Sequence, residues 1–356
     1  MTFLRFLTKS SLHLLIYLII AGMVMAFSVL IFKFGPGRSI YYDNSWDDND
    51  PYVPVTNKTY NVLLDQHSHT DYSDGKLSVR QNIEWHIALG FTVVVITDHN
   101  TLKNLEDVKQ IAEEYKNEII VIQGMEWTTS RIHLNFIGIS EWNLSIPYAP
   151  TDSEIQDAIN EVHRQNGTVT VNHLPFTAKI AEEKMPSREE LLAWGVDFLE
   201  IVNELYFDVV SYQFYLKNNE SIGVITGTDF HSPHADDGGR VHAWTTLNVE
   251  NFSKEAVMNE LRAHNTSYIV HQYGIVNQGI HKNSISYSLL RPFYELGEGL
   301  VYIHLRFDRG FAVTERIVVS VFVTYSFGFF ILVEIIIFLR KKIKLKRQRR
   351  YRNKQT

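Results

Sequence analysis

The chain of 356 residues contains no cysteine. This absence excludes disulfide bonds, and it means that nitrogen and oxygen atoms would have to hold any bound metal ion. It does not identify the cell compartment. Hydrophobic residues make up 45% of the chain and aromatic residues 13%, so apolar side chains suffice for a substantial core.

Acidic residues are missing from the C-terminal segment 340–356, which contains ten Lys and Arg residues. The whole chain nevertheless has a formal net charge of -6, so the remainder is strongly acidic. An acidic body repels polyanions at long range, which disfavours a nucleic-acid partner.

Charged residues are also nearly missing from two long apolar runs. The run from Leu12 to Phe32 has no Asp, Glu, Lys or Arg, and the run from Ile317 to Leu339 has one acid, Glu334. Each run has the length of a bilayer-spanning helix, and core helices are rarely apolar on every face for so long. We therefore predict transmembrane helices at 12–34 and 317–339.

The basic segment 340–356 sets the expected orientation, because positive charges beside a span stay in the cytoplasm. With two spans, the N-terminal segment 1–11 is cytoplasmic as well, and the region between the spans is extracytoplasmic. Arg5 and Lys9 agree with this orientation, whereas Lys33 and Arg38 oppose it. A signal peptide cleaved after Ala26 is the alternative, and it also exports the middle region.

The middle region alternates short apolar runs with helical patterns. Residues 35–59 are rich in Gly, Pro and Asp and are predicted to be a linker. Strands are predicted at 60–64, 92–96, 119–122, 134–139, 168–171, 198–202 and 222–225. Helices are predicted at 79–89, 104–116, 152–165, 187–194 and 253–265. This alternation predicts an α/β domain over 60–271, with a parallel sheet closed as a β/α barrel. Residues 272–316 form an extension of unknown role.

Histidines and acids follow the ends of these strands. Five strands end in such residues, and His133 precedes another strand; the residues concerned are His67, His69, Asp98, His99, Glu126, His173, Asp229 and His231. The carboxyl ends of barrel strands converge on one face. Because a cluster of acids and imidazoles is costly without compensating charge, the pattern indicates a metal site.

Each motif alone has a simpler interpretation. A single His-x-His pair usually lies in a solvated loop, Asp98 could cap a helix, and Glu126 could be a surface acid. The occurrence of all of them at strand ends in one domain favours metal binding. His86, His163 and His264 lie within helical patterns and are interpreted as structural.

Taken together, the motifs resemble those of the polymerase and histidinol phosphatase (PHP) family. They are HSHTDYSDG from His67, ITDHN from Ile96, GMEW from Gly124, HLNFIG from His133, VNHLP from Val171 and TGTDFH from Thr226. The resemblance covers residues 60–271. It implies a distorted seven-stranded (β/α)7 TIM-like barrel and a metal-dependent phosphoesterase with up to three ions, usually Zn, Mn or Fe.

The resemblance also implies a ligand set. His67, His69, Glu126 and Asp229 would hold one ion, and Glu126 would bridge to a second ion held by His133 and His173. Asp74, His99 and His231 would hold the third. Asp98 would orient His99. Arg131 and Arg240 are candidates for phosphate contacts, with a salt-bridge role as the equal alternative.

The sequence thus predicts a membrane-anchored hydrolase of phosphate mono- or diesters that uses a metal-bound hydroxide. Its expected partners are a phosphoester substrate and the lipid bilayer, and no protein partner is indicated. The alternative is a metal-stabilised extracytoplasmic sensor that signals through the second span.

Overall fold

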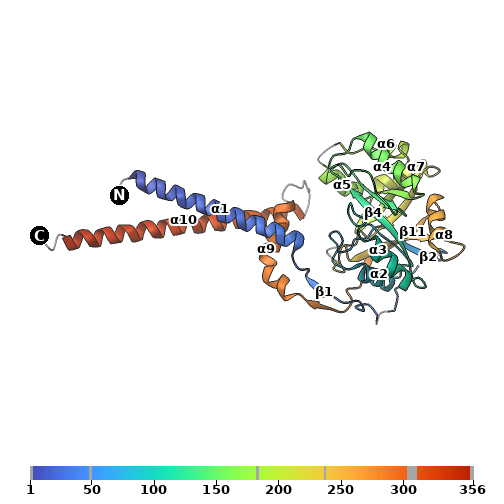
Figure 1. Cartoon of the computed structure of the whole chain (residues 1–356), viewed down its shortest axis with the longest axis horizontal. Coiled ribbons are helices and arrows are strands. Elements are labelled where there is room, and N and C mark those ends of the chain that lie inside the picture. The colour runs from blue at the N-terminus through green and yellow to red at the C-terminus, as the bar shows by residue number, and fades with distance from the viewer. Residues whose placement is uncertain (1–2, 48–49, 182–183, 236–237, 303–310, 353–356) are drawn as a thin grey trace. The chain divides into compact units, whose positions relative to one another are not determined.

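The computed structural model describes residues 3–47, 50–181, 184–235, 238–302 and 311–352 (Figure 1). The chain forms two compact units, residues 39–283 and residues 1–38 with 284–356. Parts of several predicted segments lie outside the described residues, namely 303–310 of the extension and 353–356 of the basic tail.

The larger unit is built on a curled sheet that contains all seven predicted strands. They are β2 (Val62–Asp65), β3 (Val93–Ile96), β4 (Ile120–Thr128), β5 (His133–Ile137), β6 (Thr168–Val171), β7 (Phe198–Asn203) and β9 (Gly223–Gly227). β2 to β7 are neighbours in chain order, and β9 pairs with β7. The sheet curves into a half-barrel, which confirms the predicted α/β class with a distorted barrel.

The prediction of an all-parallel sheet was wrong at β5. This strand is antiparallel to both of its neighbours, β4 and β6, whereas β2–β3–β4 and β6–β7–β9 are parallel. Only residues 129–132 connect β4 to β5. A connection this short allows a hairpin but not the crossover that a parallel pair requires.

Three further strands extend the sheet beyond the predicted set, and one of them, β8 (Tyr206–Phe207), pairs antiparallel with β7. β10 (Arg240–Leu247) pairs antiparallel with β2 on one side and with β11 (Ser267–Val276) on the other. The Thr226 amide of β9 also donates to Thr245 Oγ1 of β10 at 2.9 Å, which draws the two ends of the half-barrel together. The predicted boundary between residues 271 and 272 falls inside β11.

Helices pack against this sheet (Figure 1). Those at the predicted positions are α2 (Val79–Ala88), α3 (Leu105–Glu114), α4 (Asp152–Arg164), α6 (Arg188–Ala193) and α8 (Lys254–Arg262). Ser78, Thr151 and Ser187 each close a capping box, which explains why α2, α4 and α6 begin where they do. Two helices, α5 (Leu174–Ile180) and α7 (Val209–Asn218), were not predicted from the sequence. They are rich in aromatic and β-branched residues, which have modest helix propensity.

Part of the predicted linker belongs to the larger unit. β1 (Ser39–Tyr41) pairs with β12 (His281–Asn283), and the buried rings of Tyr41 and Trp46 stack at 5.4 Å. Further along, the Tyr52 ring stacks on Trp244 at 5.5 Å, and its amide donates to the Ala88 carbonyl. Burial of these aromatic rings therefore holds the segment on the domain.

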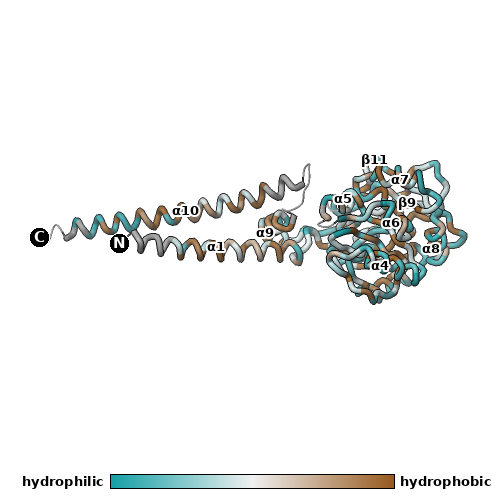
Figure 2. Tube along the Cα trace, turned by 90° about the horizontal axis from the view of Figure 1, so that it is seen from above, coloured by the Kyte–Doolittle hydropathy of each residue, from teal (hydrophilic) through white to brown (hydrophobic). Residues whose placement is uncertain are grey.

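The smaller unit consists of α1 (Phe3–Phe34), α9 (Ile285–Tyr302) and α10 (Phe311–Arg352). Ser11–Phe34 and Ile317–Gln348 are long and apolar enough to cross a membrane, with mean hydropathies of 2.7 and 2.3. Figure 2 shows the hydrophobic stretches along α1 and α10 and the hydrophilic C-terminal end of α10. Polar contacts join the helices, because His13 meets Glu334 and Tyr17 Oη lies 2.9 Å from Ser326 Oγ.

Two glycines provide a matched test of how the Tyr52 segment docks. Gly90 and Gly195 both have positive φ, 83° and 92°, so alanine is strained at either position. A Cβ at Gly90 would overlap the Tyr52 carbonyl oxygen, whereas one at Gly195 has its nearest neighbour, His163 Cε1, at 3.6 Å. We expect Gly90→Ala to lose roughly 1–3 kcal/mol more unfolding free energy than Gly195→Ala. Denaturant unfolding of the full chain in detergent measures the difference, and equal losses would contradict the docking.

Candidate metal centre

All nine predicted metal ligands gather at one edge of the half-barrel. Residues that follow β2, β3, β6 and β9 reach this edge because those parallel strands end there, and Glu126 lies near the end of β4. His133 is the first residue of β5, and the reversed direction of β5 brings its start to the same edge. The hairpin thus explains why this one ligand precedes its strand.

The nine residues form three groups in which the potential ligand atoms lie within 4.8 Å of one another. One group contains His67, His69, Glu126 and Asp229, and a second contains Glu126, His133 and His173. The third contains Asp74, His99 and His231 together with His69. Glu126 and His69 therefore each belong to two groups, which makes the three groups one continuous cluster.

Glu126 lies at the centre of this cluster, fully buried among five imidazoles. Its Oε1 is 3.0 Å from His133 Nδ1 and 3.3 Å from His173 Nε2. Its Oε2 is 2.9 Å from His99 Nδ1, 3.4 Å from His67 Nε2 and 3.5 Å from His69 Nε2. One carboxylate oxygen therefore faces each side of the cluster, as a bridging ligand requires.

The two aspartates extend the cluster from the interior toward solvent. Asp229 Oδ1 is 3.1 Å from Nε2 of both His67 and His69. Asp74 lies 3.3 Å from His231 Nε2 and 3.5 Å from His99 Nε2, and its side chain is 54% exposed. The third group is therefore the one that opens to solvent.

Backbone strain accompanies the ligands. His173 and Asp229 have positive φ values of 24° and 54°, and Asn100, directly after His99, has a φ of 53°. Non-glycine residues rarely adopt such conformations unless the surrounding structure imposes them. They lie at the ends of β3, β6 and β9, so the fold imposes an uncommon backbone conformation beside the cluster.

The donor atoms fit divalent metal ions. Three carboxylates and six imidazoles form the cluster, and within the described part of the chain His67 Nε2, His69 Nδ1 and Glu126 Oε2 are buried without a hydrogen-bond partner. Buried polar atoms are normally paired, and nitrogen and oxygen ligands suit several first-row ions. A bound cation would satisfy these atoms and offset the buried negative charge.

The electrostatics of the protein alone show how strongly these groups interact. Burial raises the pKa of Glu126, but His99 and His67 outweigh it and bring that pKa well below its ordinary value. Burial together with His231 and His99 lowers the pKa of His69 to about 4. The His69 ring stacks with each of those two rings, with centroids 4.3 and 4.4 Å away, and its neutral form is the one that can bind a metal.

Glu200 is a residue of the site that the sequence analysis missed. Its Oε1 accepts from His67 Nδ1 at 3.0 Å and its Oε2 accepts from the His173 amide at 2.8 Å. This contact fixes the His67 ring so that Nε2 faces Glu126 and Asp229. The available signal was an acid inside the apolar strand FLEIVN, which is buried over its whole length.

A second buried acid, Asp65, holds the loop that contains His67. Asp65 pairs with His86 Nε2 at 3.0 Å, and it accepts from Thr228 Oγ1 at 2.5 Å and the His67 amide at 3.1 Å. It therefore ties the residues before His67 to those before Asp229. His86 is structural, as predicted from its helical position.

Asp98 does not have the role predicted for it. Its carboxylate accepts from the amide and hydroxyl of Thr70, from Ser73 Oγ and from Asn104 Nδ2, at 2.6–2.7 Å. Among the described residues it makes no hydrogen bond to His99, whose Nδ1 is instead 2.6 Å from Thr128 Oγ1. The loop after β3 lies close to the loop after β2, so the Asp98 carboxylate bonds the turn between His69 and Asp74 instead of the His99 ring.

In the described part of the chain, groups outside the cluster hold both of the predicted phosphate-binding arginines. Arg131 donates to the Lys184 and Pro150 carbonyls and forms an ion pair with Asp152 at 2.7 Å. Arg240 donates to the Tyr273 carbonyl in β11. Arg131 thus has the salt-bridge role that the sequence left open.

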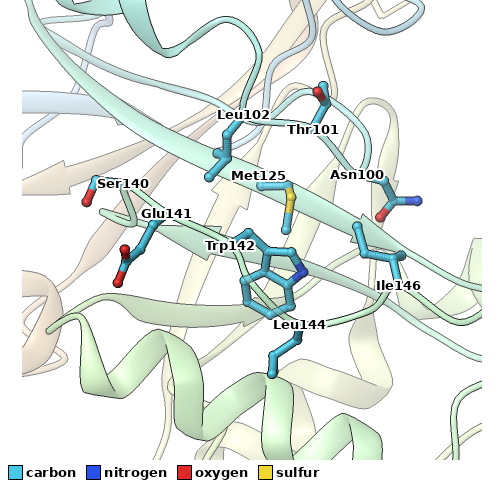
Figure 3. A pocket seen from close by; sticks show the side chains of 9 residues that line it. All are labelled: Asn100, Thr101, Leu102, Met125, Ser140, Glu141, Trp142, Leu144 and Ile146. Carbon is cyan, nitrogen blue, oxygen red and sulfur yellow. The ribbon is translucent and has the colours of Figure 1, made fainter.

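A pocket of about 500 Å³ lies near the cluster but on the other face of β4 (Figure 3). Met125 and Trp142 line it, together with Asn100, which follows His99. Successive side chains of a strand point to opposite faces, so Met125 faces this pocket while Glu126 faces the metal centre. The pocket is therefore separate from the ligand cluster.

Comparisons with known proteins place the chain in context. A family model described as the PHP domain matches residues 65–310. No curated protein sequence matches the chain. A two-domain protein from Bacteroides vulgatus, which contains a predicted PHP-like metal-dependent phosphoesterase, is similar in structure, with 23% identity and a TM-score of 0.48 over 69% of this chain and 73% of that one. Histidinol phosphate phosphatase from Lactococcus lactis, complexed with zinc, L-histidinol and phosphate, has 18% identity and a TM-score of 0.28 over 48% and 86%.

Removal of metal should destabilise the protein, because a ligand that binds only the folded state stabilises it by mass action. At a hundredfold excess of ion over Kd, the gain is about 2.7 kcal/mol, or roughly 5–10 °C in Tm for a domain of this size. Thermal unfolding with and without chelator measures the shift, and metal analysis identifies the ion. An unchanged Tm in a protein that purifies without metal would argue against the centre.

Glu200 should affect metal affinity without being a ligand. Glu200→Gln keeps the size of the side chain but removes the charge that orients His67, so we expect metal affinity to fall about 10–100-fold. Glu84→Gln is a matched control, since Glu84 in α2 is also buried and, among the residues that the structure describes, accepts a hydrogen bond only from Tyr115 Oη, at 2.7 Å. Competitive metal titration distinguishes the two, and similar affinities in both variants would refute the orienting role.

Proposed function

The chain belongs to the PHP domain family, and on this premise we propose that it is a metal-dependent phosphoesterase that hydrolyses phosphate mono- or diesters. The observation that carries the proposal is the continuous cluster of nine ligand residues with Glu126 shared between two groups. We propose that it holds up to three divalent ions, with Zn, Mn and Fe as the candidates.

Such ions, when bound, supply Lewis acidity toward phosphoryl oxygens and lower the pKa of a coordinated water. The protein's own residues supply the arrangement. Glu126, His67 and His69 are fully buried and define the interior of the site, where Glu200 fixes the His67 ring. Asp74, His99 and His231 are partly exposed, so the phosphoester would enter on their side.

We further propose that α1 and α10 span the membrane and hold the larger unit on its extracytoplasmic side. The length and hydropathy of Ser11–Phe34 and Ile317–Gln348 support spanning, and the basic residues that follow Leu339 support a cytoplasmic C-terminus. The proposed enzyme would then act on phosphoesters outside the cytoplasm.

Two aspartates allow a matched test of the activity. Asp229 and Asp197 have similar side-chain exposure, 17% and 18%, but Asp197 pairs with His163 and the Val169 amide at the opposite end of the strands. We expect Asp229→Asn to lower kcat/KM for p-nitrophenyl phosphate or its bis ester more than 100-fold, because a carboxylate ligand is lost. Asp197→Asn should stay within a few fold of wild type.

The assay uses metal-loaded full-length protein in detergent and measures release of p-nitrophenol. Absence of turnover on both esters with each of the three candidate metals would contradict the proposed function. Equal losses in the two variants would instead assign Asp229 a merely structural role.

The absence of cysteine makes the orientation directly testable. Val55→Cys places a thiol on a residue that is 95% exposed in the larger unit, and Lys346→Cys places one beyond the second apolar run. We expect a membrane-impermeant maleimide to label Val55→Cys in intact cells and to label Lys346→Cys only after permeabilisation. The reverse pattern would overturn the proposed topology.

A further inference from the structure

An exposed apolar surface lies beside the metal centre. It is formed by α5, by the hairpin that follows β7 and by the first turn of α7. The exposed fractions are 40% for Phe176, 65% for Leu205, 61% for Tyr206, 42% for Phe207, 52% for Val209 and 59% for Val210. We refer to these six residues as the apolar rim. Contiguous apolar surface of this kind marks an interaction site.

The rim is continuous with the ligand cluster. α5 begins directly after the ligand His173, and the Phe176 ring packs edge-on against the His173 ring with centroids 5.4 Å apart. β8 (Tyr206–Phe207) pairs with the end of β7, where Asn203 lies opposite Tyr206. Asn203 Nδ2 in turn donates to Glu200, the acid that orients His67. A molecule on the rim therefore lies next to the metal centre.

The chemistry of the rim favours a lipid. The Lys179 ammonium lies over the Tyr206 ring, 5.6 Å from its centroid, and ring contacts continue from Phe207 to Tyr212 at 5.5 Å. Aromatic rings beside a lysine are typical of surfaces that meet the boundary between lipid and water. The same chain has two helices that are long and apolar enough to span a membrane, and such an anchor would keep the protein at a lipid surface. A sugar or nucleotide would need polar partners that the six rim side chains, apart from the Tyr206 hydroxyl, do not offer.

We propose that the substrate is a phosphate ester of a long-chain lipid alcohol, whose hydrocarbon part lies on the apolar rim while its phosphate reaches the metal centre. The proposal rests on the proposed function and names its substrate class. For a monoester, the oxygen of water bonds to phosphorus, the ester P–O bond breaks and the leaving alkoxide takes a proton. The products are the lipid alcohol and inorganic phosphate.

The test compares one lipid ester with one water-soluble ester. Full-length metal-loaded protein in mixed micelles is assayed on dioleoyl phosphatidic acid and on p-nitrophenyl phosphate. The rim variant is Leu205→Ser with Val210→Ser. The control variant is Val53→Ser with Val55→Ser, which removes apolar side chains that are 73% and 95% exposed and that closely follow Tyr52 in the chain, whose amide bonds the C-terminal residue of α2.

We expect the wild type to prefer the lipid ester. In the rim variant, the ratio of kcat/KM for the lipid ester to that for the soluble ester should fall at least about tenfold, since two apolar contacts are lost. The control variant should keep the wild-type ratio. No lipid preference, or an unchanged ratio in the rim variant, would overturn the proposal while the phosphoesterase function stands.

A second readout does not depend on turnover. Phosphatidic acid with a photoreactive group in its acyl chain, added to protein in chelator, should crosslink to peptides that contain residues 174–179 and 205–210. Crosslinks only to other parts of residues 39–283 would refute the apolar rim as the lipid-binding site. Burial of the rim in a dimer of the wild-type chain, seen as a shift in sedimentation that the rim variant abolishes, would likewise overturn the proposal. Absence of hydrolysis of either ester would overturn both this inference and the proposed function.

Discussion

The site depends on the buried carboxylate of Glu126. It contacts five imidazoles that come from the ends of β2, β3 and β6 and the start of β5, so one side chain joins the separate motifs. A charge buried this deeply is stable only with compensating partners. The histidines supply part of that compensation, and bound cations would supply the rest. The fold and the proposed metal centre are therefore coupled through this residue.

The antiparallel direction of β5 places the last of these imidazoles, that of His133, beside Glu126. In a uniformly parallel barrel, His133 at the start of a strand would lie at the edge opposite the other ligands. The hairpin from β4 to β5 turns the strand around and brings His133 within 3.0 Å of Glu126. A local feature of chain connection thus decides whether the second group of ligands exists.

A layer of buried polar residues supports the ligands. Glu200 fixes His67 and the His173 backbone, Asp65 joins the loops before His67 and Asp229, and Asp98 holds the turn that leads to Asp74. These acids do not belong to the three ligand groups, but their hydrogen bonds determine which way the ligands point. Next to this layer, the exposed side chains of Phe176 and Tyr206 form an apolar surface. The same edge of the sheet therefore carries both the polar cluster and an apolar surface.

The sequence by itself determined the seven strands, the α/β class, the two apolar helices and the identity of the nine residues that cluster. Strand periodicity and the placement of His, Asp and Glu beside strand ends are local properties, and they can be read from neighbouring residues. Asp74 was added to the set only by the resemblance of the motifs to those of the PHP family. Only the tertiary structure decided the direction of β5, the added strands β8, β10 and β11, the contacts of Asp98 and Arg131, and the role of Glu200. These depend on residues that are distant in the chain: Glu200 and His67 are joined by a hydrogen bond across 133 positions. No local pattern encodes such a contact, because packing of the whole barrel creates it.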